Sequence, residues 1–220
     1  MNNLHDYLKK VETQCMDFSK ELNTLSAEEQ FEILKRSCKY LYPEDKVLEK
    51  LVNSKKNKKP LTIKFGVDPT GTNLHLGHAV PLTLLNRLQR MGHKIIFLVG
   101  DFTASIGDPS GKISLKKNLS RKVIENNLKG YKKQASKFIN FSKTDIQYNT
   151  SWLNDLKLPE IIEIFNKINL SISLDRNDFI QRMKNKVEMT HAELVYPIIM
   201  GFDSVVLNPD MEVGGEDQMD

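Results

Sequence analysis

Cysteine is scarce in this sequence, and long apolar runs are absent. The 220 residues include two cysteines, Cys15 and Cys38, which are far apart and have no C-x-x-C partner. Disulfide frameworks and structural zinc sites need several cysteines or histidines at short spacing, so neither is expected. No segment is apolar for long enough to cross a bilayer, and residues 1–10 lack the apolar stretch of an export signal. We therefore expect a cytoplasmic protein.

A large excess of charge of one sign is also missing. The chain has 32 basic and 28 acidic residues, a net charge of +4, which by itself indicates neither a nucleic-acid surface nor a membrane surface. Lysines are concentrated in residues 53–60. We interpret this run as a solvated loop rather than a phosphate site, because charge runs are usually exposed. The length is sufficient for one domain with a sizeable core and a small appendage.

The order of the predicted elements indicates an α/β domain preceded by helices. A capping box at Ser26 begins a helix that reaches about residue 40, and Pro43 suits the first turn of a second helix ending near Leu51. Strands and helices then alternate: strands over 61–67, 95–99 and 145–149, and helices over 76–91, from 120 towards 138, around 159–168 and around 190–200. This alternation predicts a mainly parallel sheet, with ligands at the carboxyl ends of its strands. Residues 100–119 show neither the helical nor the strand spacing of apolar residues and are expected to form a functional loop.

The clearest chemical signal is the segment FGVDPTGTNLHLGH at residues 65–78. A strand ends in a turn rich in Gly, Pro and Asp, and the next helix begins with His75 and His78 on one face of its first turn. Helix N-termini attract phosphate, imidazoles can donate to phosphate oxygens, and Gly77 leaves room for a flat ring. The segment therefore indicates a nucleotide site. A simple capping pair is the alternative, whereas zinc would need a third ligand that the neighbouring sequence does not offer.

A second segment, GDFTASIGDPSGK at residues 100–112, follows the predicted strand that ends at Val99. Its glycines permit tight turning, Asp108 could hold an ammonium group, and Lys112 could reach a polyphosphate. An ordinary turn rich in Gly, Asp and Ser is the alternative interpretation.

A third segment, residues 191–203, is predicted to be a helix that brings Tyr196, Met200 and Asp203 to one face. A carboxylate buried at this face would need a partner, and the phenol hydroxyl of a substrate could supply the hydrogen bond. Core packing is the alternative, because tyrosine and methionine at this spacing commonly line a core.

The last segment, EVGGEDQ at residues 212–218, has two glycines that let a ligand approach the backbone. Asp217 is placed to accept hydrogen bonds from ribose hydroxyls, and Gln218 could hydrogen-bond near a reacting carboxyl group. A plain Gly-Gly turn is the alternative.

These segments, in this order and at these spacings, closely resemble the tyrosyl-tRNA synthetases among the class I aminoacyl-tRNA synthetases. HLGH resembles the HIGH signature of class I, GDPSGK and the segment around Tyr196 resemble the tyrosyl enzymes, and GGEDQ resembles their ribose-binding stretch. The run NTSW at residues 149–152 also matches, and we assign Trp152 to packing. The resemblance extends from about residue 26 to residue 218.

The resemblance implies a fold and a set of roles. The fold is a Rossmann-like catalytic domain over residues 61–220 with an N-terminal helical segment over residues 1–60. The function is ATP-dependent activation of L-tyrosine and its transfer to tRNA(Tyr) by a homodimer, with Mg²⁺ arriving on ATP, no other bound cofactor and no resident metal. The implied site residues fall into three sets: Thr70, His75, His78 and Lys112 in catalysis; Gly66, Asp68, Gly77, Gly215 and Asp217 in ATP binding; and Lys64, Thr103, Asp108, Asn149, Tyr196, Met200, Asp203 and Gln218 in tyrosine binding.

The sequence departs from the family pattern in three ways. Lys64 stands where many bacterial members have a tyrosine next to the substrate phenol, although one branch of the family has lysine. Met200 replaces a glutamine that usually lines the pocket. The sequence stops at Asp220, before the position of the second class I signature, KMSKS. We expect a piece of a longer polypeptide, in preference to a truncated paralogue, and we expect the 220-residue chain by itself not to charge tRNA.

Two other functions stay open at this point. One is a non-catalytic module that binds nucleotide or tyrosine without activating it, which the missing second signature favours. The other is an enzyme that supplies an aminoacyl adenylate to a small-molecule acceptor.

Overall fold

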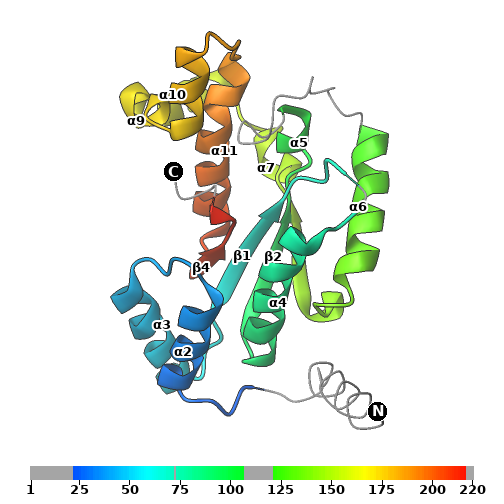
Figure 1. The fold of residues 1–220 in the computed structure, drawn as a ribbon, viewed down its shortest axis with the longest axis vertical. Helices are drawn as coiled ribbons and strands as arrows, with labels where there is room; N and C mark the ends of the chain where they lie inside the picture. The colour runs from blue at the N-terminus through cyan, green and yellow to red at the C-terminus, as the bar shows by residue number, and fades with distance from the viewer. Residues whose placement is uncertain (1–21, 72, 107–120, 217–220) are drawn as a thin grey trace, which may run out of the picture.

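The computed structural model describes residues 22–71, 73–106 and 121–216 of the chain. Its centre is a sheet with the strand order β3-β2-β1-β4 (Figure 1). The strands are β1 Thr62–Val67, β2 Lys94–Val99, β3 Thr144–Tyr148 and β4 Met211–Val213. Each neighbouring pair runs parallel. The predicted α/β class with a mainly parallel sheet is thereby confirmed.

The two central strands show why this sequence forms a covered sheet. In β2 every residue from Ile95 to Val99 is buried, as expected for a parallel strand with helices on both faces. In β1 the alternation of side chains puts Ile63 and Phe65 on one face and Lys64 on the other. The register pairs Lys64 with Glu212 of β4.

Helices surround the sheet on both faces (Figure 1). Their bounds are α2 Ala27–Ser37, α3 Glu44–Asn57, α4 Leu76–Arg90, α5 Thr103–Ile106, α6 Arg121–Ala135, α7 Thr150–Leu153, α8 Leu158–Asn166, α9 Leu170–Leu174, α10 Asn177–Lys184 and α11 His191–Leu207, with a 3-10 turn at Phe141–Lys143. Within the described ranges, none of these helices combines the length and the apolar character that crossing a bilayer requires.

The apolar core lies on the face of the sheet that α4 and α6 cover. Ile63 and Phe65 of β1 pack there with buried leucines of α4 and with Tyr131 of α6. Helix α11 lies over the opposite face, where the Lys64 ammonium reaches the carbonyl of Met200. The one charged residue inside β1 therefore points towards the helix that was predicted to carry substrate contacts.

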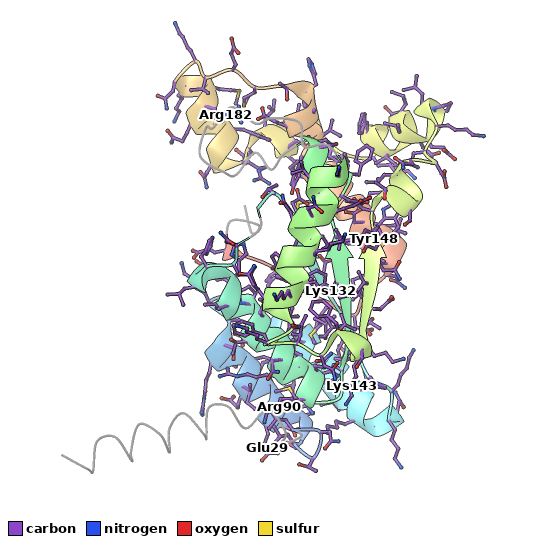
Figure 2. All side chains as sticks on the ribbon, turned by 90° about the vertical axis from the view of Figure 1, so that its right-hand side faces the viewer. Glu29, Arg90, Lys132, Lys143, Tyr148 and Arg182 are labelled. Atoms are coloured by element: carbon purple, nitrogen blue, oxygen red, sulfur yellow. The ribbon has the colours of Figure 1, made fainter. Side chains whose placement is uncertain are left out.

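The remaining helices lie at the two ends of the molecule. Helices α2 and α3 pack together and join the core through Leu34 and Leu51. Helices α9 and α10 lie at the other end (Figure 1). Figure 2 shows Arg182 of α10 and Glu29 of α2 at opposite ends, with Tyr148 of β3 between them.

Several element boundaries differ from the predicted ones. Helix α3 continues to Asn57, so the first part of the lysine-rich run is helical, and its assignment to a loop was wrong. No glycine or proline interrupts this segment before Pro60, and the helix ends only at Lys58, whose φ of 51° is left-handed. Within the stretch expected to be an irregular loop, residues 103–106 form α5. The sequence patterns also did not reveal α9, α10 and β4.

Candidate active site

Side chains from three strand ends and from α11 meet in one hydrogen-bonded network. Asp68 follows β1, Thr103 lies beyond β2, and Asn149 follows β3, while α11 adds Tyr196 and Asp203. The carboxyl ends of neighbouring parallel strands lie at one edge of a sheet, where open α/β sheets bind ligands. The structure thus brings together residues that the sequence assigned to the tyrosine and ATP sites.

Asp68 links the strand ends to α11. Its Oδ1 accepts a hydrogen bond from the Thr103 hydroxyl at 2.7 Å, and its Oδ2 accepts one from the Tyr196 hydroxyl at 2.9 Å. Gly100 makes this approach possible, because a Cβ there would lie 2.0 Å from Asp68 Oδ1 and 2.3 Å from the Thr103 hydroxyl oxygen. The sequence analysis gave Gly100 no role in the site, although a glycine at the end of a buried strand was a usable signal.

Asn149 connects this network to the far end of α11. The side chain is fully buried, and its Oδ1 accepts from the backbone N–H of Phe102 at 2.9 Å. Its Nδ2 donates to the Thr103 hydroxyl at 3.2 Å and to Asp203 Oδ2 at 3.1 Å. Because every side-chain hydrogen-bonding atom of Asn149 has a protein partner, its orientation is set before any ligand binds.

Asp203 is a carboxylate held in a buried position by uncharged donors. The residue is 2% exposed. Its Oδ2 accepts from Asn149 and its Oδ1 accepts from the indole N–H of Trp152 at 2.8 Å. The assignment of Trp152 to packing alone was therefore wrong, because the indole polar atom orients the carboxylate. The signal was available, since a buried indole N–H usually finds an acceptor.

The environment of Asp203 shifts its ionisation. Burial raises the pKa of the carboxyl group, while the hydrogen bonds from Asn149 and Trp152 and the positive charge of Lys64 oppose that rise. Each carboxylate oxygen has a second lone pair. Asp203 can therefore accept one further hydrogen bond from a hydroxyl group in the pocket.

Lys64 lies under α11 rather than pointing freely into the pocket. The residue is 6% exposed. Its ammonium donates to the Ser204 hydroxyl at 2.5 Å, to Glu212 Oε2 at 3.2 Å and to the Met200 carbonyl at 3.5 Å. The structure places Lys64 beside the residues predicted to bind tyrosine, and its described contacts are with the protein.

The start of α11 is fixed by a cap and an ion pair. The Thr190 hydroxyl accepts from the backbone N–H of Glu193, and the Glu193 carboxylate accepts from the backbone N–H of Thr190. Arg182 of α10 donates to the same carboxylate at 3.1 Å. These contacts hold the first turn of the helix that carries Tyr196, one turn further along.

The two histidines form the N-terminal cap of α4. His75 Nδ1 accepts from the backbone N–H of Gly77 at 3.1 Å, and His78 Nδ1 accepts from the backbone N–H of His75 at 3.3 Å. The ring centroids are 4.0 Å apart. A Cβ at Gly77 would lie 2.9 Å from the His75 ring, so glycine is needed for this cap as well as for ligand access.

The capping pattern sets which imidazole nitrogen can donate to a ligand. Since both Nδ1 atoms accept, the proton of each neutral ring is on Nε2. Burial, and to a lesser extent the neighbouring His75, lower the pKa of His78. The pair is therefore a cap and can also offer two imidazole donors at a helix N-terminus.

The turn between β1 and α4 is tied down by α6. The backbone N–H of Thr70 donates to the Asp68 carbonyl at 2.7 Å. Asn127 of α6 donates to the Pro69 carbonyl at 2.9 Å, and Gln134 accepts from the backbone N–H of Leu74 at 3.1 Å. Asn127 and Gln134 were not recognised from the sequence, because their importance depends on where α6 packs.

The predicted glycines differ in how the protein surrounds them. A Cβ at Gly66 would be at ordinary contact distance, 4.0 Å, from Leu98. Gly215 is exposed after β4, and the adjacent Glu216 pairs with Lys39 from the segment after α2. This ion pair connects the N-terminal helices to the turn that was predicted to bind ribose.

Some predicted site residues cannot be placed. Asp108, Lys112, Asp217 and Gln218 lie outside the described residues. In the part of the chain that the structure describes, no group of three or more histidine, cysteine or carboxylate side chains could hold a metal ion.

Comparison with known proteins shows the family of this chain. The sequence matches the family described as tRNA synthetases class I (W and Y) over residues 55–220. The chain belongs to this family. Class I membership accounts for the parallel sheet and for the HLGH segment at the start of α4.

Curated relatives of this chain carry the name tyrosine–tRNA ligase. A protein of Carboxydothermus hydrogenoformans is 41% identical over 189 residues, 86% of this chain and 46% of the relative. Tyrosine–tRNA ligase 2 of Clostridium acetobutylicum is 39% identical over 191 residues, 87% of this chain and 48% of the relative. The chain spans about half the length of the curated relatives it matches.

Solved structures support the fold. A C-terminally truncated mitochondrial tyrosyl-tRNA synthetase of Aspergillus nidulans has a TM-score of 0.70 at 24% identity, covering 97% of this chain and 63% of that one. The tyrosyl-tRNA synthetase of Archaeoglobus fulgidus, solved with L-tyrosine, has a TM-score of 0.68 at 19% identity. The match covers 88% of this chain and 56% of that one.

Proposed function

We propose that this chain is the catalytic half of a tyrosine–tRNA ligase, which activates L-tyrosine with ATP and transfers the tyrosyl group to tRNA(Tyr). The observation that supports this most is Asp203, a buried carboxylate on α11 that neutral donors orient. A site built to hydrogen-bond a hydroxyl rejects analogues that lack it, because its buried acceptor would be left without a partner. The names of the curated relatives support the same substrate.

The network suggests how tyrosine would lie. The phenol would point to Asp203, with Asn149 behind that carboxylate and Lys64 below the helix. The amino group would lie at the other end of the pocket, where Asp68 and Tyr196 already form a hydrogen bond. Thr103, Met200, Asp108 and Gln218 complete the proposed tyrosine-binding set.

The nucleotide would lie over the start of α4. Thr70, His75 and Lys112 would surround the leaving pyrophosphate. The other ATP contacts would come from His78, Gly66, Asp68, Gly77, Gly215 and Asp217. Magnesium enters as part of the substrate MgATP, held chiefly by the phosphates, because Mg²⁺ keeps its waters and seldom needs a protein cage.

The proposed reaction has two steps without a covalent enzyme intermediate. A carboxylate oxygen of tyrosine attacks the α-phosphorus of ATP, and the bond to pyrophosphate breaks. A ribose hydroxyl at the 3′ end of tRNA then attacks the carbonyl carbon of the adenylate, and AMP leaves. Positioning and charge stabilisation provide the catalysis, with the imidazole N–H groups of His75 and His78 acting on phosphate oxygens.

We further propose a homodimer that forms through the surfaces of α8 and α9. Leu158 and Ile162 lie one turn apart on α8 and are 70% and 49% exposed, and Ile172 on α9 is 70% exposed. An apolar cavity of about 310 Å³ lies nearby, between α5, α8 and α11. Exposed apolar side chains on two consecutive helices favour a protein contact there. Ile162→Asp and Ile172→Asp should shift sedimentation from dimer to monomer; a monomeric wild-type chain would rule the dimer out.

We also propose a boundary near residue 60 between the helical segment and the catalytic domain, and a cytoplasmic location. Because the chain spans about half the length of its curated relatives, we expect these 220 residues alone not to charge tRNA.

Calorimetry on the 220-residue chain tests the substrate. We expect wild type to bind tyrosine in preference to phenylalanine and tryptophan, and Asp203→Asn to lose most of that preference. Sites built to hydrogen-bond a substrate hydroxyl, that of tyrosyl-tRNA synthetases among them, prefer the substrate over the analogue without the hydroxyl by roughly 10⁴-fold or more. Asp145→Asn is the matched control, since the exposed Asp145 carboxylate of β3 accepts from Gln147. Equal binding of tyrosine and phenylalanine by wild type would refute the assignment.

A further inference from the structure

Lys64 is a buried cation whose hydrogen-bond acceptors all belong to α11 and β4. Its ammonium has three protons and reaches three protein acceptors, the Ser204 hydroxyl, the Met200 carbonyl and Glu212 Oε2. The side chain is 7% exposed, whereas that of Glu212 is 49% exposed. The cation is therefore inside the fold, and its counter-ion lies at the rim.

The sheet fixes the Lys64–Glu212 pair. The two residues are directly opposite each other in the parallel β1–β4 register. Side chains at paired positions lie on the same face of a sheet. Glu212 Oε2 lies 3.2 Å from the Lys64 ammonium, so the shortest strand of the sheet supplies the counter-ion.

Asp203 is a second carboxylate near the same ammonium. It adjoins Ser204, which binds Lys64 directly, and the Lys64 charge acts against the rise that burial causes in the pKa of Asp203. The negative charge of the Asp101 carboxylate raises the pKa of Asp203. Among the described residues Asp203 forms no ion pair, and its hydrogen-bond donors are the uncharged side chains of Asn149 and Trp152.

Two carboxylates therefore interact with one buried ammonium, Glu212 by direct contact and Asp203 through its charge. A buried charge that loses its counter-ion is costly and turns to another partner when one is near. Without the Glu212 charge, Lys64 would turn towards Asp203. An ion pair between them would occupy the acceptor that a hydroxyl in the pocket needs, and would lower the affinity for it.

We propose that Glu212 is a positioning residue that holds the Lys64 ammonium at the β1–β4 edge and thereby keeps Asp203 open to the hydroxyl group of the substrate. The inference about the substrate rests on the proposed function. The competition between the two carboxylates for Lys64 does not.

The single tryptophan gives a ligand-free test. Trp152 is the only tryptophan in the sequence, and its indole N–H donates to Asp203. Its ¹⁵N–¹H resonance should therefore follow the protonation of Asp203 as the pH is varied. The charged or titratable groups around this site are Asp101, Lys64, Glu212 and the Asp68–Tyr196 pair. The expected midpoint falls by about one pH unit or more in Glu212→Gln and rises in Lys64→Met.

A matched control separates this effect from a general change of charge. Glu49→Gln removes the same charge from an exposed ion pair with Lys46 on α3, and its midpoint should equal that of wild type. Thermal denaturation of each variant checks that the fold is retained. An unchanged midpoint in a folded Glu212→Gln variant overturns the proposal.

Binding then tests the consequence for selectivity. Calorimetry should show that Glu212→Gln reduces the ratio of tyrosine affinity to phenylalanine affinity about tenfold, the effect of about 1.4 kcal/mol. Adding Lys64→Met to Glu212→Gln should raise the ratio above that of Glu212→Gln alone, because no ammonium is left to occupy Asp203. No rise in the double variant, or a wild-type ratio in Glu212→Gln, overturns the proposal. If wild type binds no tyrosine, the proposed function fails and the selectivity role with it, while the indole titration still decides which carboxylate holds Lys64.

Discussion

The hydroxyl of Tyr196 donates a 2.9 Å hydrogen bond to Oδ2 of Asp68, although 128 residues separate the two in the sequence. The bond joins α11 to the end of β1 and leaves one wall of the pocket assembled without a ligand. Preorganised polar groups lose little freedom when a substrate binds.

Tyr196→Phe should weaken both the fold and tyrosine binding. Removing a hydrogen bond to a carboxylate that is partly exposed should lower the free energy of unfolding by about 1–2 kcal/mol, and the tyrosine Kd should rise about tenfold. Urea denaturation and calorimetry measure the two effects. Tyr131→Phe is the matched control, because the Tyr131 hydroxyl is buried with no hydrogen-bond partner among the described residues, and its loss should leave stability unchanged or raise it. Equal stability losses in both variants would contradict this interpretation.

His75 has a capping role and a proposed catalytic role, and two substitutions separate them. His75→Asn keeps a side-chain acceptor at the N-cap, so the melting temperature should stay near that of wild type. In a chain of the relatives' full length, tyrosine-dependent pyrophosphate exchange into ATP should fall about 100-fold, with tyrosine affinity nearly unchanged, because the imidazole acts mainly in the transition state. His75→Ala should in addition lose about 1 kcal/mol of stability with the cap. Normal exchange in His75→Asn would remove His75 from the mechanism.

Met200→Gln should tighten tyrosine binding. Methionine is a weak acceptor, whereas a glutamine amide could accept from the substrate ammonium. One charge-assisted hydrogen bond contributes about 1.5–3 kcal/mol, so the Kd should fall at least about tenfold. Calorimetry decides, with Met183→Gln on α10 as the control, since Met183 is 45% exposed and outside the pocket. Unchanged or weaker binding in Met200→Gln would mean that the amino group is bound elsewhere.

His93 should make the chain less stable in acid. It is 6% exposed, its Nδ1 accepts from the backbone N–H of Leu61, and its Nε2 lies 3.1 Å from Gln30 Oε1. Burial, and then the charge of Lys55, lower the pKa of His93 from 6.5 to about 4, while Asp210 opposes the shift. Between these pKa values the unfolded chain binds more protons than the folded one.

The contribution of neutral His93 is therefore complete above pH 6.5 and is lost as the pH falls towards 4, at up to about 1.4 kcal/mol per pH unit. Urea denaturation at a series of pH values measures it. His93→Gln should flatten the dependence over this range. The same slope in both proteins would assign the acid sensitivity to other groups.

Local sequence was sufficient wherever neighbouring residues decide the structure. The capping box at Ser26 and the apolar run of β2 depend on residues a few positions apart, and both occur as predicted. The HLGH segment likewise shows its helix start in the sequence, because capping involves only residues from His75 to His78. The family resemblance added the order of these segments along the chain.

Only the tertiary structure decided which polar groups meet. Asp68 finds Tyr196 because parallel strands end at one edge and α11 crosses above them. Trp152 orients Asp203, and Glu212 holds Lys64, because short elements with little pattern of their own are placed by packing. These contacts join residues from 51 to 148 positions apart, and a buried polar group takes whichever partner the fold brings within reach. The sequence by itself determined which side chains could do the chemistry, and packing determined which partner each would have.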